Sequence, residues 1–434
     1  MKKIGMIADD LTGANDSGVQ LVKKGLRSSV IFDLKPLDTA QHNIDAIVVD
    51  TDSRAIHKDD AYEAVRKASV FLKENGFMYI YKKVDSTLRG NLGAEIEAVT
   101  SVFNPDFCII APAFPRIGRT TKNGIHYLHG IPLSETEISR DPKCPVTESS
   151  IVTLLESQSS QKVGLVQTSV MGAGLEALKT GLEKWKEQGI KWLVFDAETD
   201  EELENIAATF SAISGNFIWV GSAGLAEYLP EKLGLIRADN TRPEEMKGEN
   251  VLVVSGSLSS VTREQISNLL EMGQMVSTEV DPLTVFEENN LWIARKKSYI
   301  EKLVSIYQDG KDAVLFVDSS SENRDKTAAA GKRLGLSPSE VSNRISHGLG
   351  EIASEFLKNH SFVSGLVLTG GDTAKDVCLQ IGASGLELLK EVESGIPLGK
   401  LTGEHEFFAI TKAGAFGNKQ SLVNAVLELK GEKQ

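Results

Sequence analysis

Short apolar runs recur along the chain, and most of them end in a turn that contains Gly or Asp. In the first half these runs are Ile4–Ala8, Ser29–Phe32, Ala46–Val49, Met78–Tyr81, Phe107–Ala111, Lys162–Val166, Trp192–Phe195 and Phe217–Val220. Stretches with helical periodicity lie between several of them, as at Asp59–Glu74 and Asp200–Ser211. Continuous apolar strands that alternate with helices predict a largely parallel sheet that is covered by helices on both faces.

This pattern stops near Leu235, and a polar segment with a Pro, a Gly and no apolar period follows at 238–250. A second series of apolar runs then begins, at Val251–Val254, Gln274–Ser277, Ala313–Val317, Gly365–Thr369 and Phe407–Thr411. Helical stretches such as Thr262–Glu271 and Ala374–Ile381 lie between these runs. The sequence therefore predicts two α/β domains, 1–237 and 251–434, that are joined by a linker at 238–250. We expect the active site in a cleft between them, which is a common place for a site that takes two substrates.

Composition narrows the class of protein. The chain has 434 residues, and 47 basic against 60 acidic side chains give it a formal charge of −13. Proteins that coat nucleic acid or bind anionic membranes need a basic face, so we expect neither partner. Three scattered cysteines without a CxxC pair argue against a disulfide framework and against a thiolate zinc site. The apolar runs are too short to span a membrane or to form a signal peptide, so a cytoplasmic location is expected. The oligomeric state stays open, a homo-oligomer included.

The first candidate site is the turn Ala8–Asp16, which follows the first apolar run and opens a helix that ends near Lys24. Ligands of open α/β sheets bind beyond the carboxyl ends of the strands, and Asp9 and Asp10 are placed there. Adjacent carboxylates repel each other unless a polyol, a metal ion or an Arg binds to them and compensates the repulsion. We favour a functional role for this pair. For Asp16 alone, a position in the first turn near the helix dipole is sufficient explanation.

Two further polar loops follow apolar runs. In Thr51–Arg54, the planar guanidinium of Arg54 suits a carboxylate, although a surface ion pair would explain it equally well. The loop Lys82–Asn91 collects two lysines, an arginine, an aspartate and two hydroxyls. Such a set suits a small anionic, hydroxylated molecule, with cations for its carboxylate and with Asp85 and Ser86 for its hydroxyls. The alternative is a solvated loop with local capping.

The loop Ala111–Thr121 is held in an extended form by its prolines, and its arginines add positive potential. The sequence does not show which way these arginines point. On a helix, His126 and His129 would share a face. No carboxylate or thiol stands at a ligand spacing from them, so we expect no metal site there.

Three turns of the second domain consist of small residues after an apolar run: Ser255–Ser259, Thr369–Ala374 and Lys412–Gly417. Glycine lets backbone amides approach an oxyanion, and the N-terminus of a following helix adds a favourable dipole. Together these turns predict a phosphate cradle and a bound nucleotide. The sequence does not match either of two common nucleotide-binding motifs. The nearest approach to a Walker A loop, Gly395–Leu401, is one residue short and ends in Leu, and Gly13 stands alone after the first run, which disfavours a dinucleotide dehydrogenase.

With these motifs in this order, the sequence resembles the four-carbon acid sugar kinase family over nearly its whole length. The resemblance is carried by Ala8–Asp16, Lys82–Asn91, Ala111–Thr121, Val220–Leu229, Ser255–Ser259, Leu368–Ala374 and Thr411–Gly417. Members of this family phosphorylate the terminal hydroxyl of four-carbon sugar acids with ATP. Their N-terminal domain binds the acid sugar and their C-terminal domain binds the nucleotide. Within the family, the segment Gly13–Gly25 looks most like the D-threonate kinases.

Carried over position by position, the resemblance implies two groups of site residues. The sugar-acid site comprises Asp10, Arg54, Lys83, Val84, Asp85 and Ser86, to which the polar loops themselves add Asp9 and Arg89. The ATP contacts are Ser257, Gly370, Gly371, Asp372, Thr373, Lys412, Ala413, Gly414, Ala415 and Gly417. Mg²⁺ is expected to bridge the phosphates of ATP, and the sequence does not identify its ligands.

The expected reaction converts D-threonate and ATP to 4-phospho-D-threonate. We expect Arg54 and Lys83 to hold the carboxylate of the sugar acid, and Asp10 or Asp85 to accept the proton from the attacking 4-hydroxyl. The sequence does not choose between these two aspartates. One alternative is a kinase for D-erythronate, L-threonate or a 3-oxo-tetronate. An alternative from another class is a non-catalytic sugar-acid sensor.

Overall fold

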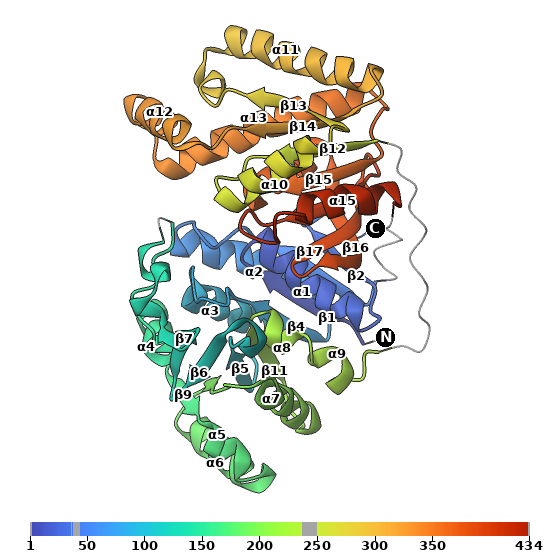
Figure 1. Cartoon of the computed structure of the whole chain (residues 1–434). Helices are drawn as coiled ribbons and strands as arrows, with labels where there is room; N and C mark the ends of the chain where they lie inside the picture. Colours follow the sequence, from blue (N-terminus) through green and yellow to red (C-terminus); the bar gives the residue numbers. More distant parts are fainter. Residues whose placement is uncertain (1, 36, 38–43, 142, 237–249, 433–434) are drawn as a thin grey trace. The chain divides into compact units, whose positions relative to one another are not determined.

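The computed structural model describes residues 2–35, 37, 44–141, 143–236 and 250–432 (Figure 1). The chain divides into two compact units, Met1–Asn240 and Thr241–Gln434, which we call the N-terminal and the C-terminal unit. Each unit has a hydrophobic core of its own. The predicted linker at 238–250 lies outside the described residues except for Asn250. Both units are α/β with mostly parallel strands, which confirms the predicted fold class.

Parallel strands form the main sheet of the N-terminal unit, in a spatial order that differs from the chain order. This order is β2 (Ser28–Ile31), β3 (Ala46–Asp50), β1 (Ile4–Ala8), β4 (Tyr79–Lys83), β11 (Phe217–Gly221), β5 (Phe107–Ala111), β10 (Trp192–Phe195) and β9 (Val163–Val166). From β1 the chain runs to β2 and β3, which lie on one side of β1, and then crosses to β4 on the other side of β1. A ligand crevice opens at such a reversal, beyond the carboxyl ends of the strands.

Helices cover both faces of this sheet (Figure 1). One face carries α1 (Leu11–Lys23), α7 (Asp200–Ala212), α8 (Ala223–Ala226) and α9 (Leu229–Lys232). The other face carries α2 (Lys58–Glu74), α3 (Leu92–Phe103) and α4 (Ile151–Gln158), while α5 (Thr168–Gly172) and α6 (Leu175–Glu187) follow β9. The side chain of Asp10 caps the start of α1. This helix ends at Lys23, with Lys24 as its C-cap, and Gly25 follows with a left-handed φ of 84°. The predicted end of this helix is therefore confirmed.

A small antiparallel sheet of β6 (Arg119–Lys122), β7 (Ile125–Leu128) and β8 (Ile131–Pro132) was not predicted. Short 3₁₀ helices flank it at η2 (Pro115–Ile117), η3 (Leu133–Glu135) and η4 (Glu137–Arg140). This sheet places His126 on a strand, so the helical arrangement considered for His126 and His129 is wrong. Alternation of apolar and polar residues over only four positions is too short to distinguish such strands from loops.

In the C-terminal unit the sheet order is β13 (Met275–Val280), β14 (Asp312–Val317), β12 (Val251–Ser255), β15 (Gly365–Thr369), β18 (Phe408–Lys412), β17 (Ile396–Gly403) and β16 (Ala383–Glu393). The first five are parallel, and β16 and β17 form an antiparallel hairpin that the sequence analysis missed. One face carries α10 (Ser260–Glu271) and α15 (Ser421–Lys430). The other carries α11 (Asn289–Gln308), α13 (Pro338–Asn359) and α14 (Gly371–Gln380), with α12 (Ser321–Arg333) packed on α13 and η5 (Thr284–Phe286) before α11 (Figure 1). None of the helices in the described part of the chain is both long and apolar enough to cross a membrane.

Candidate active site

Three polar loops of the N-terminal unit lie at the carboxyl ends of the neighbouring strands β3, β1 and β4. The strand register places Ala8 beside Asp50 on one side and beside Lys83 on the other. Beyond the sheet, the amides of Ser53 and Arg54 both donate to the carbonyl oxygen of Asp9, at 2.9 and 3.1 Å. The backbone thus ties the loops after β1 and β3 together at the crevice that the strand order creates.

The guanidinium of Arg54 lies between two adjacent carboxylates. Its Nε and Nη2 donate to Asp9 at 2.7 and 3.1 Å, and its Nη1 and Nη2 donate to Asp10, each at 2.7 Å. A third carboxylate, that of Asp85, lies 3.7 Å from Nη2. An arginine therefore neutralises the repulsion between Asp9 and Asp10. It is one of the three groups that the sequence predicted could do so, the others being a polyol and a metal ion. Its fork holds two carboxylates of the protein, and the expectation that Arg54 also holds the carboxylate of a substrate stays a prediction.

Asp9 and Asp10 differ in their affinity for a proton. Burial would raise the pKa of Asp9, but the charge and hydrogen bonds of Arg54 outweigh burial and hold this pKa below its usual value. Burial raises the pKa of Asp10; Arg54 offsets part of this effect, and the charge of Asp9 adds to it. Asp10 also caps α1, since its Oδ1 accepts from the amide of Gly13 at 2.8 Å. Its Oδ2 accepts from Arg54, and the side chain is 24% exposed, which leaves the carboxylate able to accept from a further donor.

Asp85 is enclosed by its own loop. Its carboxylate accepts from the hydroxyl and the amide of Thr87, and from the guanidinium of Arg89 at 2.7 and 3.2 Å. Burial would raise the pKa of Asp85, but Arg54 and Arg89 hold it far below its ordinary value. Arg89 in turn pairs with Asp141 at 3.2 Å. Asp85 and Arg89 therefore shape the loop that carries Ser86.

Two lysines at the end of β4 point to opposite faces of the sheet. Both lysines were predicted to lie in a loop, but β4 extends to Lys83, and successive residues of a strand alternate in direction. Lys82 is fully buried and pairs with Glu95 of α3 at 2.7 Å, a partner that the sequence analysis missed. Lys83 points toward α1, because a Cβ on Gly13 would lie 2.6 Å from its Nζ. Its Nζ donates to the carbonyl oxygen of Val84 at 2.9 Å, and no carboxylate of the described residues pairs with it.

The small sheet brings two further residues to this loop. His126 is buried, with Nε2 at 2.9 Å from the carbonyl oxygen of Ser86 and Nδ1 at 2.9 Å from the hydroxyl of Thr121. Burial lowers the pKa of His126 to about 4, so the ring is neutral and Nε2 donates to Ser86. Arg119 precedes Thr121 by two positions on β6 and so points to the same face, toward the loop. Its Nη1 donates to the carbonyl oxygen of Ile117, and its buried Nε has no partner among the described residues.

In the C-terminal unit the three glycine turns meet around Ser257. They follow β12, β15 and β18, which are neighbours in the sheet. A Cβ on Gly370 would lie 3.5 Å from the amide nitrogen of Ser257, and a Cβ on Gly414 would collide with its hydroxyl. A Cβ on Gly256 would likewise collide with the hydroxyl of Thr373 in the first turn of α14. Side chains larger than glycine would separate these turns. We call the turns at 256–257, 370–373 and 413–417 the glycine cradle.

Lys412 shapes one turn of the glycine cradle. It is the last residue of β18, one position beyond the predicted strand, and its ammonium donates to the carbonyl oxygens of Ala413, Gly414 and Phe416 at 2.8, 3.2 and 3.2 Å. A peptide group is planar and trans, so the amides one residue further on point away from Lys412. These are the amides of Gly414, Ala415 and Gly417, and such a row of amides suits a phosphate. Burial lowers the pKa of Lys412 to about 8. Lys412 thus supports this turn, and its predicted contact with ATP stays a prediction.

Comparison with known proteins agrees with this division of the chain. A family model described as a sugar-binding N-terminal domain matches residues 4–229, and one described as a nucleotide-binding C-terminal domain matches residues 252–422. A D-erythronate kinase from Heliobacterium modesticaldum and a D-threonate kinase from Salmonella typhimurium are each 33% identical to this chain, and each alignment covers 98% of this chain and 97% of the relative. A 3-oxo-tetronate kinase from Haemophilus influenzae is 30% identical, over 96% of this chain and 97% of its own.

A solved structure of a Haemophilus influenzae protein has the same fold. The solved structure superposes with a TM-score of 0.75 and 26% identity, and the match covers 97% of this chain and 98% of that one. The two family models and the full-length relatives together show that this chain belongs to the four-carbon acid sugar kinase family.

Proposed function

We propose that the protein transfers the γ-phosphoryl group of ATP to the 4-hydroxyl of a four-carbon sugar acid, with D-threonate as its main substrate. As a member of this family, the protein is a sugar-acid kinase. The observation that carries the proposal is the open carboxylate of Asp10 beside Lys83, at the reversal of a parallel sheet. The glycine cradle of the C-terminal unit supports the choice of a nucleotide as the phosphoryl donor.

Asp10 is the residue that we assign to the proton of the attacking hydroxyl. The 4-oxygen attacks the γ-phosphorus, the bond from this phosphorus to the bridging oxygen of ADP breaks, and the hydroxyl proton passes to Oδ2 of Asp10. A raised pKa favours this transfer, and Arg54 holds the carboxylate in position. Asp85 is the poorer acceptor, because its hydrogen bonds from Thr87 and Arg89 hold its pKa far below the ordinary value.

Near the loop after β4, the described part of the structure shows no carboxylate paired with Lys83 or Arg119, and we assign these two cations to the two ends of the substrate. Lys83 and Oδ1 of Asp10 both lie within 3 Å of the position that a Cβ on Gly13 would take, so Lys83 is close to the 4-hydroxyl and to the phosphoryl group that it receives. The carboxylate of the sugar acid then lies at the other end. We assign Arg119 to that end, because its place on β6 directs it toward the loop after β4. Burial lowers the pKa of Arg119, and the charge of Asp85 offsets part of this effect. This assignment replaces the expectation that Lys83 holds the carboxylate.

The phosphates of ATP are assigned to the amides of the glycine cradle, and the donor brings Mg²⁺ with it. No cluster of three or more metal-ligating side chains occurs among the described residues. This fits Mg²⁺, which usually binds nucleotides through phosphate oxygens, water and one or two carboxylates. Asp372, in the first turn of α14 within the cradle, is a carboxylate at such a place. When bound, Mg²⁺ neutralises charge on the phosphates.

The test is a coupled assay of ADP release with the purified full-length chain. The panel comprises D-threonate, L-threonate, D-erythronate and the 3-oxo-tetronates. We expect the highest kcat/KM with D-threonate. A higher value for another tetronate would replace the substrate and keep the reaction, since the relatives named for different tetronates are equally similar to this chain. Binding of a tetronate without ADP release from any of them would replace the kinase by a sugar-acid sensor.

A further inference from the structure

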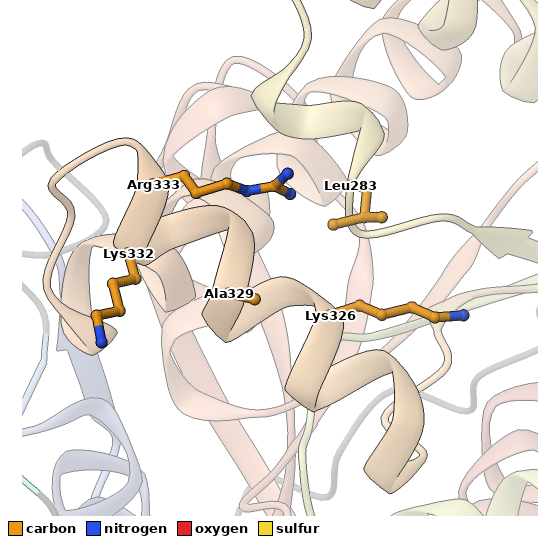
Figure 2. A pocket seen from close by; sticks show the side chains of 5 residues that line it. All are labelled: Leu283, Lys326, Ala329, Lys332 and Arg333. Atoms are coloured by element: carbon orange, nitrogen blue, oxygen red, sulfur yellow. The ribbon is translucent and has the colours of Figure 1, made fainter.

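A cavity beside α12 in the C-terminal unit is lined by three cations that do not converge on one anion. Its lining residues are Leu283, Lys326, Ala329, Lys332 and Arg333. Figure 2 shows that the side chains of Lys332 and Arg333 extend in different directions from the helix. Lys326 is moreover paired with Glu322 at 2.7 Å. A more specific arrangement of polar groups is found in the N-terminal unit, at the start of α3.

The helix α3 receives its cap from another helix. Asn91 occupies the N-cap position, yet its side chain caps no amide of α3, all of whose residues the structure describes. Asparagine is among the preferred N-cap residues, because its side-chain oxygen ordinarily accepts from an amide of the first turn. Gln158, the last residue of α4, does this instead, since its Oε1 accepts from the amide of Gly93 at 2.9 Å. The side chain of Asn91 is thus directed to another part of the molecule.

The side-chain amide of Asn91 binds the turn that carries Arg54. Its Nδ2 donates to the carbonyl oxygens of Ser53 and Ile56, at 3.0 and 2.9 Å, so both of its hydrogens are used. These carbonyls stand immediately before Arg54 and two residues after it. Cys144 supplies a further donor, because its thiol donates to the carbonyl oxygen of Arg54 at 3.3 Å. Burial raises the pKa of this thiol, so it keeps the proton that it donates.

The turn at 52–56 depends on these hydrogen bonds for its shape. Asp52 has a φ of 50°, in the left-handed region that residues other than glycine rarely adopt. The last two residues of the turn are exposed, so they bury little apolar surface that could hold it in place. The donors from Asn91 and Cys144 therefore help to fix the direction in which Arg54 leaves the backbone.

We propose that Asn91 is a positioning residue of the phosphoryl transfer. Its amide holds the turn at 52–56, this turn directs Arg54, and Arg54 aims the carboxylate of Asp10 at the 4-hydroxyl of the sugar acid. The proposal rests on the proposed function, in which Asp10 accepts the proton of this hydroxyl. Hydrogen bonds weaken steeply away from their preferred angles. A displacement of about 1 Å in a catalytic site can cost about a hundredfold in rate.

The pH dependence of the reaction reports on the position of Arg54. Burial raises the pKa of Asp10, Arg54 and Lys83 lower it, and the charges of Asp9 and Asp85 raise it. Among these charged groups, only Arg54 belongs to the turn that the side-chain amide supports. If Arg54 moves away, the pKa of Asp10 rises further, and the carboxylate is protonated at a higher pH. The acidic limb of kcat/KM should then move to higher pH.

The test is Asn91→Ser, with Asn216→Ser as its matched control. Serine also suits an N-cap, but its short hydroxyl has one hydrogen in place of the amide that binds two carbonyls. Asn216 uses its amide in the same way at the other end of α3, where it donates to the carbonyl oxygens of Phe103 and Asn104 at 3.2 and 3.5 Å.

With the preferred tetronate, we expect Asn91→Ser to lower kcat by about tenfold or more. We also expect the acidic limb of its kcat/KM profile to move up by roughly half a pH unit or more. Asn216→Ser should lower stability and change neither quantity. Cys144→Ala removes a single weaker donor to the same turn, so it should lower kcat a few-fold with a shift in the same direction. This milder variant keeps the test decisive if thermal melting shows that Asn91→Ser does not fold.

A wild-type kcat and an unshifted acidic limb in Asn91→Ser would overturn the proposal. An equal loss of kcat in Asn91→Ser and Asn216→Ser, or a loss without the shift, would overturn it too, because either result indicates a general structural role. A crystal structure of Asn91→Ser tests the geometry directly. We expect its Arg54 to lie beyond hydrogen-bond distance of Asp10, and an unmoved Arg54 would contradict the proposal. This structure decides the role of Asn91 even if the wild type phosphorylates no tetronate, a result that would remove the proposed function.

Discussion

Asp10 and Asp85 are two carboxylates of one site with opposite surroundings, and their amide variants should differ accordingly. Asp10→Asn removes the proton acceptor, so we expect kcat to fall by about 10²- to 10⁴-fold while the tetronate still binds. Asp85→Asn removes the partner of Arg89 and loosens the loop, so we expect a higher KM for the tetronate and lower stability. Steady-state kinetics with calorimetric binding separate the two effects. A wild-type kcat in Asp10→Asn, or an equal loss of kcat in both variants, would assign the proton elsewhere.

Arg119 and Arg116 stand three positions apart, and only the first is assigned to the substrate. Arg116 is exposed and pairs with Asp200 and Glu227 at 3.4 and 3.0 Å, which makes Arg116→Ala a matched control. We expect Arg119→Ala to raise the KM for D-threonate by about tenfold or more, the usual cost of losing a charge-assisted hydrogen bond, with the KM for ATP unchanged. A four-carbon polyol without a carboxylate should bind Arg119→Ala and wild type equally. If the variant loses polyol and acid alike, Arg119 does not recognise the carboxylate.

At the scale of elements, the buried parallel strands were the most predictable part of the fold. Ile4–Ala8 and Phe107–Ala111 appear with their predicted bounds, because a strand covered on both faces is a continuous apolar run between turns. The ends of β4 and β18 were predicted too short, since both continue into lysine. A lysine can be buried only where a partner meets it, and for Lys82 this is Glu95, thirteen positions along the chain on another element.

For the candidate site, the location of the polar loops was as predictable as the buried strands. The strand-end rule located the polar loops correctly, because the position of a loop beyond a strand follows from the chain itself. The ion pairs among the side chains of these loops could not be predicted from the sequence. Arg54 reaches Asp9 and Asp10 across more than forty positions, and its choice of partner depends on the order in which the strands assemble. The same holds for Arg119, whose direction was fixed only by the strand β6.

The strands β6 and β7 are held against the loop after β4 by His126, and this contact should be sensitive to acid. Burial lowers the pKa of His126 to about 4 from its ordinary value of 6.5. Between these values the unfolded chain binds a proton that the folded protein does not, so the free energy of unfolding falls as the pH drops from 6.5 toward 4. His126→Gln keeps a donor for the Ser86 carbonyl and cannot titrate. We expect this variant to lose that part of the pH dependence.

Urea unfolding at about pH 7.5 and pH 4.5 measures the effect, which for a fully buried histidine is on the order of 2–3 kcal/mol in the wild type. His57→Gln, a change at an exposed histidine, is the control and should follow the wild type. An equal loss of stability on acidification in His126→Gln and wild type would show that His126 does not titrate between the folded and unfolded states.

At the scale of the whole molecule, each unit has its own core, and the proposed function assigns one ligand to each unit, so the two ligands should be separable by mutation. Lys83→Met removes a buried charge of the N-terminal unit at nearly constant volume, and we expect the tetronate affinity to fall by about tenfold or more with ADP binding intact.

Gly370→Val should weaken ADP binding and leave tetronate binding intact, because φ is 97° there and a β-branched residue cannot hold the turn of the glycine cradle. Gly273→Val carries a similar strain, with φ of 74° and open space around it, and should bind both ligands normally. Isothermal titration of the full-length chain with D-threonate and with ADP provides all of these affinities. Loss of both ligands in Lys83→Met and in Gly370→Val, with Gly273→Val intact, would mean that neither unit binds its ligand by itself, and the assignment of one ligand to each unit would fall.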